Sequence, residues 1–384
     1  MRILFTGGGS GGHFFPILAV IRELKRLSEE ERIIDLELFY MGPTSPMDDL
    51  LKQESVLIIP VVAGKMRRYF SIQNFFDIFK VGIGTIQALW NIFLLMPDVV
   101  FSKGGYGAFP AVMGAGIFDI PLIIHESDAV PGKVNLFSVR FAERIGIAFA
   151  GAATFFPKDR TAMVGIPIRK RILGGNREEA KESLGLFSTL PVVGFVGASQ
   201  GAQKVNDAVL EIVKELTEGF EVVHQTGEKN YEQVKGEAGV ILEFSHKERY
   251  HALAFLDETK MRDFYQACDL IVSRAGASSI FEIAAWGKPS ILIPIKGAAQ
   301  DHQRKGAYEY AATGAAIVIE EDNLTPHILL AEIKKIFGNA EHMKQMGEAA
   351  QRFARIDSAT VIAKEILKLG VHEIKSGSDI TQRL

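Results

Sequence analysis

Two glycine-rich loops, one near the start of each half of the chain, constrain the fold more than any other feature of the sequence. The first, Gly7–Gly12, follows a short apolar run at Arg2–Phe5, and the second, Gly197–Ala202, follows a β-branched run at Val192–Val196. Each loop leads into a segment whose apolar residues recur every three or four positions, as in an amphipathic helix. A strand, a tight turn and a helix in succession are typical of an α/β unit, so their recurrence predicts two such units.

The rest of the chain continues the alternation of short strands with helices. Further strands are predicted at Leu36–Tyr40, Val56–Val61, Val99–Phe101, Leu122–His125, Glu221–His224, Leu270–Ser273 and Ser290–Pro294. This pattern favours an α/β fold of two Rossmann-like, doubly wound parallel-sheet domains. We assign residues 1–168 to the first domain and 186–349 to the second, with the polar run Gly174–Glu179 as linker. A C-terminal helix over residues 350–370 is expected to join the first domain, and residues 375–384 to fray.

Composition and missing motifs exclude several classes of protein. The chain carries 43 basic and 46 acidic side chains, a net charge of −3, which does not favour a nucleic-acid partner. Its single cysteine, Cys268, excludes an intramolecular disulfide and a cysteine-based zinc cluster, and suits a reducing, cytoplasmic setting. There is no D-x-D triplet and no G-x-x-x-x-G-K-[ST] loop. We therefore assign no metal and no cofactor.

The first glycine loop supports a ligand site more than a dinucleotide site. Gly7, Gly9 and Gly12 fit G-x-G-x-x-G, but a dinucleotide also needs an acid after the second strand to hold the ribose, and the next acid is Asp48. The ribose-holding acid that a dinucleotide-dependent oxidoreductase needs is therefore missing. Five glycines in six residues still let a ligand approach the backbone at a helix N-terminus, although a tight turn without a ligand is the alternative.

His13 follows this loop at the expected start of a helix. A helix N-terminus disfavours the charged imidazolium, so a histidine there suits the role of general base. The alternative is a histidine with a structural role only.

The segment Arg274–Glu282, which follows a predicted strand, has two interpretations. Ser279 and Glu282 match the S-x-x-E capping box and could serve only to cap a helix. Equally, the amides around Ala277–Ser279 could hold a diphosphate at the helix N-terminus, with Glu282 accepting hydrogen bonds from a ribose diol. The spacing alone leaves both open.

A basic and aromatic segment lies between residues 65 and 90. Phe75, Phe79, Ile86 and Trp90 could form one helical stripe, either buried against a sheet or docked on an anionic membrane, since basic residues precede it. The uncharged stretch between Lys80 and Asp98 is too interrupted to span a bilayer.

Taken together, the motifs of this chain resemble one family. They are Gly7–His13 with Phe15-Pro16, Lys103–Tyr106, His125-Glu126, Val130–Gly132, Gly165, Pro167–Arg169, Gly197–Ala202, His224–Gly227, Arg274–Glu282 and Asp301–Gln303. In this order they resemble the bacterial UDP-N-acetylglucosamine–N-acetylmuramyl-(pentapeptide) pyrophosphoryl-undecaprenol N-acetylglucosamine transferases, which make lipid II from lipid I. The resemblance covers nearly the whole chain.

The resemblance implies a GT-B fold, in which two Rossmann-like domains surround a cleft. The second domain would bind UDP-N-acetylglucosamine, with uracil near Leu256, the ribose at Glu282 and the diphosphate at the amides of Ala277, Ser278 and Ser279. Other residues implied for substrate binding are Ser10, Gly11, Gly12, Glu126, Arg169, Ser199, Ile280, Phe281 and Gln303. The implied membrane-docking patch comprises Lys65, Arg67, Arg68, Phe75, Phe76, Phe79 and Trp90.

The implied activity is an inverting, metal-independent transfer of N-acetylglucosamine to the 4-hydroxyl of lipid I, at the cytoplasmic face of the plasma membrane. His13 is the first candidate base and Asp128 the second. Two departures stand out: Asp128 occupies a position where the family usually has asparagine, and so does Ile166. The alternatives are a UDP-N-acetylglucosamine 2-epimerase, another glycolipid glycosyltransferase of the same fold, or a sensor that binds without turnover.

Overall fold

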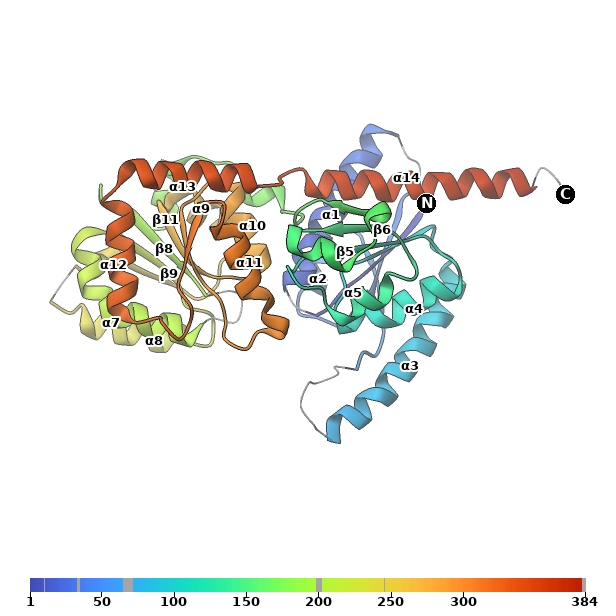
Figure 1. Ribbon diagram of the computed structural model, residues 1–384, viewed down its shortest axis with the longest axis horizontal. Coiled ribbons are helices and arrows are strands. Elements are labelled where there is room, and N and C mark those ends of the chain that lie inside the picture. Colours follow the sequence, from blue (N-terminus) through green and yellow to red (C-terminus); the bar gives the residue numbers. More distant parts are fainter. Residues whose placement is uncertain (10, 33–34, 65–71, 198–201, 245, 382–384) are drawn as a thin grey trace. The chain divides into compact units, whose positions relative to one another are not determined.

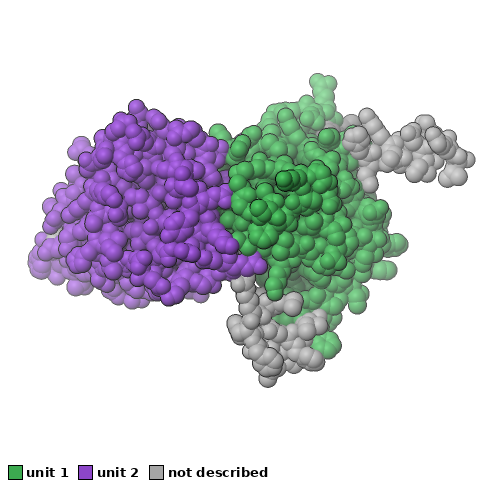
Figure 2. All heavy atoms as spheres, in the orientation of Figure 1, with its two compact units in different colours: residues 1–169, 355–384 green, residues 170–354 purple. Residues whose placement is uncertain are grey.

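The computed structural model describes residues 1–384 except 10, 33–34, 65–71, 198–201, 245 and 382–384, and only the backbone of 72–76, 78 and 372–381. The chain forms two compact units (Figure 2). Unit 1 comprises Met1–Arg169 and Arg355–Leu384, and unit 2 comprises Lys170–Ala354.

Unit 1 is built on a seven-stranded parallel sheet in the order β3-β2-β1-β4-β5-β6-β7. Its strands are β1 (Arg2–Thr6), β2 (Glu37–Gly42), β3 (Leu57–Pro60), β4 (Val99–Ser102), β5 (Leu122–Glu126), β6 (Ala142–Ile147) and β7 (Thr161–Met163). Every residue of β4 and β5 is buried, as expected for central parallel strands covered on both faces. The order of strands reverses between β1 and β4, which places a topological switch point there.

Helices cover both faces of this sheet (Figure 1). They are α1 (Gly11–Glu30), α2 (Asp48–Gln53), α3 (Ile72–Leu95), α4 (Phe109–Ile117), α5 (Lys133–Ser138) and α14 (Ser358–Thr381). Ile3 and Phe5 pack into a core with α1 and α14. Leu4, between them in the strand, packs into a second core with α3 and α4. Alternate strand residues thus fill opposite faces of the sheet.

Unit 2 has a six-stranded parallel sheet in the order β10-β9-β8-β11-β12-β13. The strands are β8 (Val192–Val196), β9 (Glu221–Gln225), β10 (Tyr250–Leu253), β11 (Leu270–Arg274), β12 (Ser290–Ile293) and β13 (Ala316–Val318). The order reverses between β8 and β11. The expectation of two doubly wound parallel-sheet α/β domains is therefore confirmed.

Eight α-helices among the described residues of unit 2 surround this sheet (Figure 1). They are α6 (Arg177–Ser183), α7 (Gln203–Gly219), α8 (Tyr231–Ile241), α9 (Glu258–Ala267), α10 (Ala277–Ala285), α11 (His302–Ala311), α12 (Pro326–Phe337) and α13 (Ala340–Phe353). One face of the sheet, with Val193 and Phe195, packs against α7 and α12 through Val209 and Ile333.

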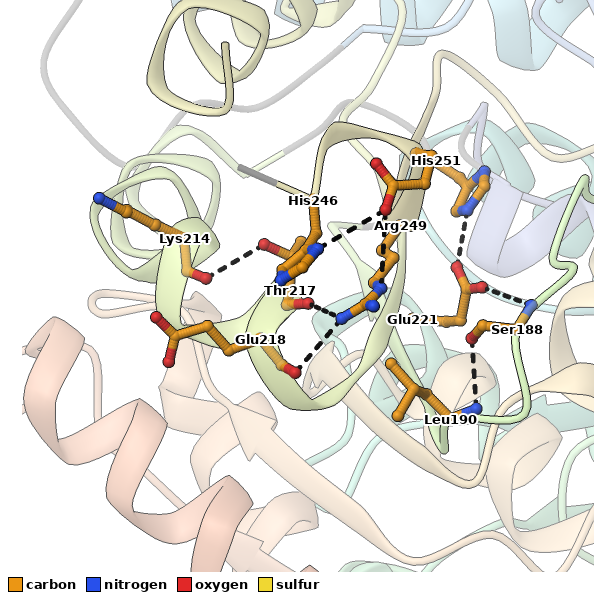
Figure 3. A network of polar contacts seen from close by, with 10 residues as sticks. Ser188, Leu190, Lys214, Thr217, Glu218, Glu221, His246, Arg249 and His251 are labelled. Carbon is orange, nitrogen blue, oxygen red and sulfur yellow. Dashed lines mark hydrogen bonds and ion pairs between the residues drawn. The ribbon is translucent and has the colours of Figure 1, made fainter. Parts of the chain in front are cut away.

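A polar network at the amino ends of β8, β9 and β10 ties these strands together (Figure 3). The Glu221 carboxylate accepts a hydrogen bond from the amide of Ser188 at 3.0 Å and lies 2.9 Å from His251 Nε2. Burial opposes the charge of Glu221, but the hydrogen bonds from Ser188 and His251 hold its pKa below the usual range.

Two boundaries differ from the sequence expectations. The run Gly174–Glu179, expected to be a linker, lies within unit 2, where Asn176 caps α6 by accepting from the amides of Glu178 at 2.8 Å and Glu179 at 3.3 Å. The expected frayed tail from residue 375 is helical through Thr381, and residues 382–384 lie outside the described part.

Candidate active site

In unit 1 the loops at the switch point bring a histidine and several glycines together. The segment after β1 and the segment after β4 leave the same carboxyl edge of the sheet, where open α/β folds bind ligands. Of the predicted residues here, Ser10 lies outside the described part of the chain. Gly11 and Gly12 are the first two residues of α1. Among the described residues, a Cβ added to Gly12 would meet no atom within 4 Å, which leaves space for a ligand beside Gly12.

His13 lies in the first turn of α1, and its ring is held in one orientation. Its Nδ1–H donates to the carbonyl oxygen of Lys103 at 3.2 Å. Because a carbonyl can only accept, this contact places the proton on Nδ1 and the lone pair on Nε2, the tautomer of a general base. A Cβ on Gly105 would lie 3.3 Å from Nε2 and 2.9 Å from Gly8 Cα, so only glycine fits beside this ring.

Glu126 ends β5 and organises the loop that follows. Its carboxylate accepts hydrogen bonds from the amides of Asp128 at 2.9 Å and Gly132 at 3.0 Å and from the Asn135 side chain at 2.9 Å. Burial, and then repulsion from Asp128, raises the pKa of Glu126. The structure thus uses this predicted substrate-binding residue to shape the loop that presents Asp128, which is half-buried.

Lys103, for which the sequence predicts no role, is a buried cation at this site. It is 1% exposed, follows β4 directly, and its Nζ donates to Ser127 Oγ. Burial lowers the pKa of this ammonium group to about 8, against the opposing effect of the nearby Glu126 and Asp128 carboxylates. In the sequence Lys103 follows Val99–Ser102 and precedes two glycines, a pattern that does not by itself indicate a buried cation.

Arg169 belongs to unit 1, where it is 6% exposed and its guanidinium lies 3.9 Å above the ring of Phe15 in α1. Stacking on an aromatic face orients the planar guanidinium.

In unit 2 the switch point places α10 directly after β11. The N-cap of α10 is Gly276, and the first helical hydrogen bond runs from the amide of Ile280 to the carbonyl of Gly276 at 3.0 Å. The amides of Ala277, Ser278 and Ser279 therefore have no carbonyl partner within the helix. These three residues are partly exposed. Free amides at a helix N-terminus of this kind are able to bind an anion.

The capping-box interpretation of Ser279 and Glu282 is wrong. The helix begins at Ala277, so Ser279 is its third residue rather than its cap, and no side chain caps this helix. Glu282 lies one turn further on, where its carboxylate accepts a hydrogen bond from the Tyr265 hydroxyl at 3.2 Å. Ile280 and Phe281 have fully buried side chains, so only their backbone could contact a ligand.

The other predicted donor contacts follow strands at the same sheet edge. Leu256 lies between β10 and α9 and is 4% exposed. Gln303 is the second residue of α11, and its Oε1 accepts from the amide of Ile295 at 3.0 Å, which orients the carboxamide so that its nitrogen can donate to a hydroxyl. Ser199 lies outside the described residues.

One side of α3 carries an exposed apolar surface, which we call the α3 patch. Ala88 and Ile92 are buried against the unit 1 core. The exposed side chains are Phe79, Ile83, Ile86, Trp90, Phe93 and Leu94, each more than half exposed. The interpretation of the stripe as buried against a sheet is thus wrong for Phe79, Ile86 and Trp90. Lys65, Arg67 and Arg68, and the side chains of Phe75 and Phe76, lie outside the described part.

No helix within the described residues has the length and apolar character needed to cross a bilayer. Nor do they contain a group of three or more histidine, cysteine, aspartate or glutamate side chains placed to hold a metal ion.

Comparison with known proteins defines the class. Residues 3–147 match the glycosyltransferase family 28 N-terminal domain, and residues 192–364 match the glycosyltransferase family 28 C-terminal domain. Together with the two doubly wound sheets, this defines a glycosyltransferase of family 28.

Three curated relatives narrow the class. All carry the name UDP-N-acetylglucosamine--N-acetylmuramyl-(pentapeptide) pyrophosphoryl-undecaprenol N-acetylglucosamine transferase. That of Bacillus thuringiensis subsp. konkukian, numbered 2, is 34% identical over 89% of this chain and 93% of its own length. Those of Clostridium tetani and Legionella pneumophila (strain Paris) are each 34% identical, over 90% and 94% of this chain and 92% and 96% of their own lengths. The chain belongs to this family of N-acetylglucosamine transferases.

Solved structures agree with this assignment. The crystal structure of Acinetobacter baumannii MurG is similar with a TM-score of 0.72 and 25% identity, over 96% of this chain and 99% of that one. A UDP-GlcNAc 2-epimerase from Neisseria meningitidis bound to UDP-GlcNAc gives a TM-score of 0.66 at 13% identity, over 96% of this chain and 100% of that one, a likeness of fold alone.

Proposed function

We propose that this chain transfers N-acetylglucosamine from UDP-N-acetylglucosamine to the 4-hydroxyl of the N-acetylmuramyl group of lipid I, giving lipid II. The observation that carries the donor half of this proposal is the start of α10. Three amides without helical partners stand one turn before a carboxylate, Glu282. The amides suit a diphosphate, and the carboxylate can accept hydrogen bonds from a ribose diol.

The acceptor half rests on His13. As the 4-hydroxyl oxygen attacks C1 of the donor sugar, its proton passes to His13 Nε2, and the bond from C1 to the diphosphate oxygen breaks with inversion at C1. Such proton removal contributes typically 10²–10⁴-fold to the rate. The negative charge of the departing UDP is stabilised by the amides of Ala277, Ser278 and Ser279, and this supplies the electrostatic stabilisation without a metal ion.

The α3 patch, on one side of that helix, supports the proposal that the protein attaches to a membrane surface. Apolar side chains exposed along one helix, such as Ile86 and Trp90, are suited to insertion between lipid headgroups. We place the enzyme on an anionic membrane at the cytoplasmic face, where a lipid-linked acceptor and a water-soluble donor meet. Nucleic acid has no part in this proposal.

The direct test is transfer of radiolabelled N-acetylglucosamine from UDP-N-acetylglucosamine to a lipid I analogue, with and without EDTA. We expect labelled lipid II in both, and a loss of turnover by about 10²-fold or more for His13→Ala with donor affinity unchanged. No transfer to lipid I would refute the proposed reaction, and loss of transfer in EDTA would refute metal independence.

A 2-epimerase is the second candidate, favoured by the likeness of fold to the Neisseria meningitidis enzyme. It gives no role to the α3 patch. Incubation with UDP-N-acetylglucosamine alone separates the two, because an epimerase would produce UDP-N-acetylmannosamine without any lipid.

A further inference from the structure

Lys103 connects the two loops of unit 1 that carry the candidate bases. Its carbonyl oxygen accepts the hydrogen bond from His13 Nδ1, while its ammonium group reaches in the other direction to Ser127 Oγ. Ser127 lies between Glu126 and Asp128, and the amide of Asp128 donates a hydrogen bond to the Glu126 carboxylate. One residue therefore contacts both the histidine and the loop that presents the aspartate.

Burying a lysine removes the hydration of its ammonium group, which costs free energy unless nearby opposite charges offset the loss. The titratable groups that act on Lys103 or respond to it are Glu126, Asp128, His125 and, through the backbone contact, His13. His125 stays neutral, because burial and the adjacent Lys103 charge hold its pKa well below the usual range. Lys103 thus interacts electrostatically, as the nearby cation, with the carboxylates of both Glu126 and Asp128.

We propose that Lys103 is a positioning residue of the acceptor site, whose buried ammonium group holds the 126–128 loop through Ser127 and balances the charges of Glu126 and Asp128. It does not touch the reacting atoms. Its effect reaches the reaction through the orientation of Asp128 and through the electrostatic environment of the base. This inference rests on the proposed transferase activity.

The main test compares the pH dependence of kcat/KM for lipid I in the wild type, Lys103→Met and Lys103→Arg. A nearby cation disfavours the protonated form of a base. Removing it in Lys103→Met should move the acidic limb of the profile upward by about one pH unit, whereas Lys103→Arg, which keeps the charge, should leave the limb in place. The difference should shrink above a pH of about 8, where Lys103 itself loses its proton.

Ser127→Ala provides a second test that keeps the charge and removes only the acceptor of the Lys103 ammonium group. We expect the KM for lipid I to rise about fivefold, the value of one ordinary hydrogen bond, with the KM for UDP-N-acetylglucosamine unchanged. This variant keeps the inference testable even if Lys103→Met does not fold, which circular dichroism would reveal.

The outcomes distinguish a failure of this inference from a failure of the proposed function. An acidic limb that stays in place in a folded Lys103→Met protein overturns the inference, and so does an unchanged lipid I KM in Ser127→Ala. If wild-type protein transfers no sugar to lipid I, the proposed function fails instead. Wild-type transfer combined with unshifted variants leaves the function standing and removes only the role of Lys103.

Discussion

Gly105 offers the sharpest test of how the histidine is held. Its φ is +81°, and a Cβ there would lie 2.9 Å from Gly8 Cα, a backbone atom that cannot rotate away. Alanine at a positive φ costs about 1–2 kcal/mol, and forcing extra atoms into a packed site costs about 1–3 kcal/mol more. We therefore expect Gly105→Ala to lower the free energy of unfolding by about 3 kcal/mol and to displace the Gly8 loop and His13.

Gly314→Ala is the matched control. Gly314 has a φ of +86°, but a Cβ there would meet nothing within 4 Å, so this variant carries the backbone cost alone. Urea unfolding should show about 1–2 kcal/mol of destabilisation for Gly314→Ala, with transfer unchanged. Gly105→Ala should lose about 10²-fold in transfer, the effect of misplacing a catalytic group by about 1 Å. Equal destabilisation and equal activity in the two variants would refute the idea that Gly105 fits against Gly8 and His13.

Three further predictions concern other parts of the molecule. Glu282→Gln should weaken binding of UDP-N-acetylglucosamine by about 10-fold or more in calorimetry, because hydrogen bonds to a charged group are worth about 1.5–3 kcal/mol, while Tyr265→Phe should have a smaller effect. Trp90→Glu should reduce co-sedimentation with anionic vesicles, whereas Phe244→Glu, at a residue of unit 2 that is 94% exposed, should not; equal losses would remove the α3 patch from membrane binding. Because the folded-state pKa of Glu221 lies below its usual value, the stability that its carboxylate contributes should be present above pH about 4.5 and be lost as pH falls through the lowered pKa. Wild type and Glu221→Gln should therefore differ in thermal unfolding at pH 7 and converge in acid, and a constant difference across that range would contradict the assignment of this charge (Figure 3).

Most of the strands could be predicted because the central strands are strongly apolar, whereas β6, β7, β10 and β13 were not predicted. Val99–Phe101 and Leu122–His125 fall within β4 and β5, whose residues are all buried. β13 could not be predicted, since it has three residues and is only partly buried, which gives too little periodicity to recognise.

The position of a helix start was harder to predict than its existence. The S-x-x-E pattern at Ser279 and Glu282 is a genuine capping signal, but the cap of α10 is Gly276, three residues before Ser279, where the chain leaves β11. Tertiary context therefore overrides the local motif. Because the helix begins at Ala277, the amides of Ala277, Ser278 and Ser279 lie in its first turn and have no carbonyl partner within the helix.

The sequence patterns could not reveal that the charged residue Lys103 is buried inside the site. Lysine is almost never fully buried, so a sequence gives no reason to place Lys103 in the interior. Only the folded structure shows that the Lys103 side chain is 1% exposed. Similarly, a stripe of aromatic residues on α3 fits a core or a membrane equally well until the buried face of the helix, with Ala88 and Ile92, is known.

A crystal structure of the protein with UDP-N-acetylglucosamine tests the central claim most directly. We expect the diphosphate oxygens within about 3 Å of the amides of Ala277, Ser278 and Ser279, and the ribose hydroxyls at Glu282. A donor bound away from the first turn of α10 would contradict the claim that this helix N-terminus holds the sugar nucleotide.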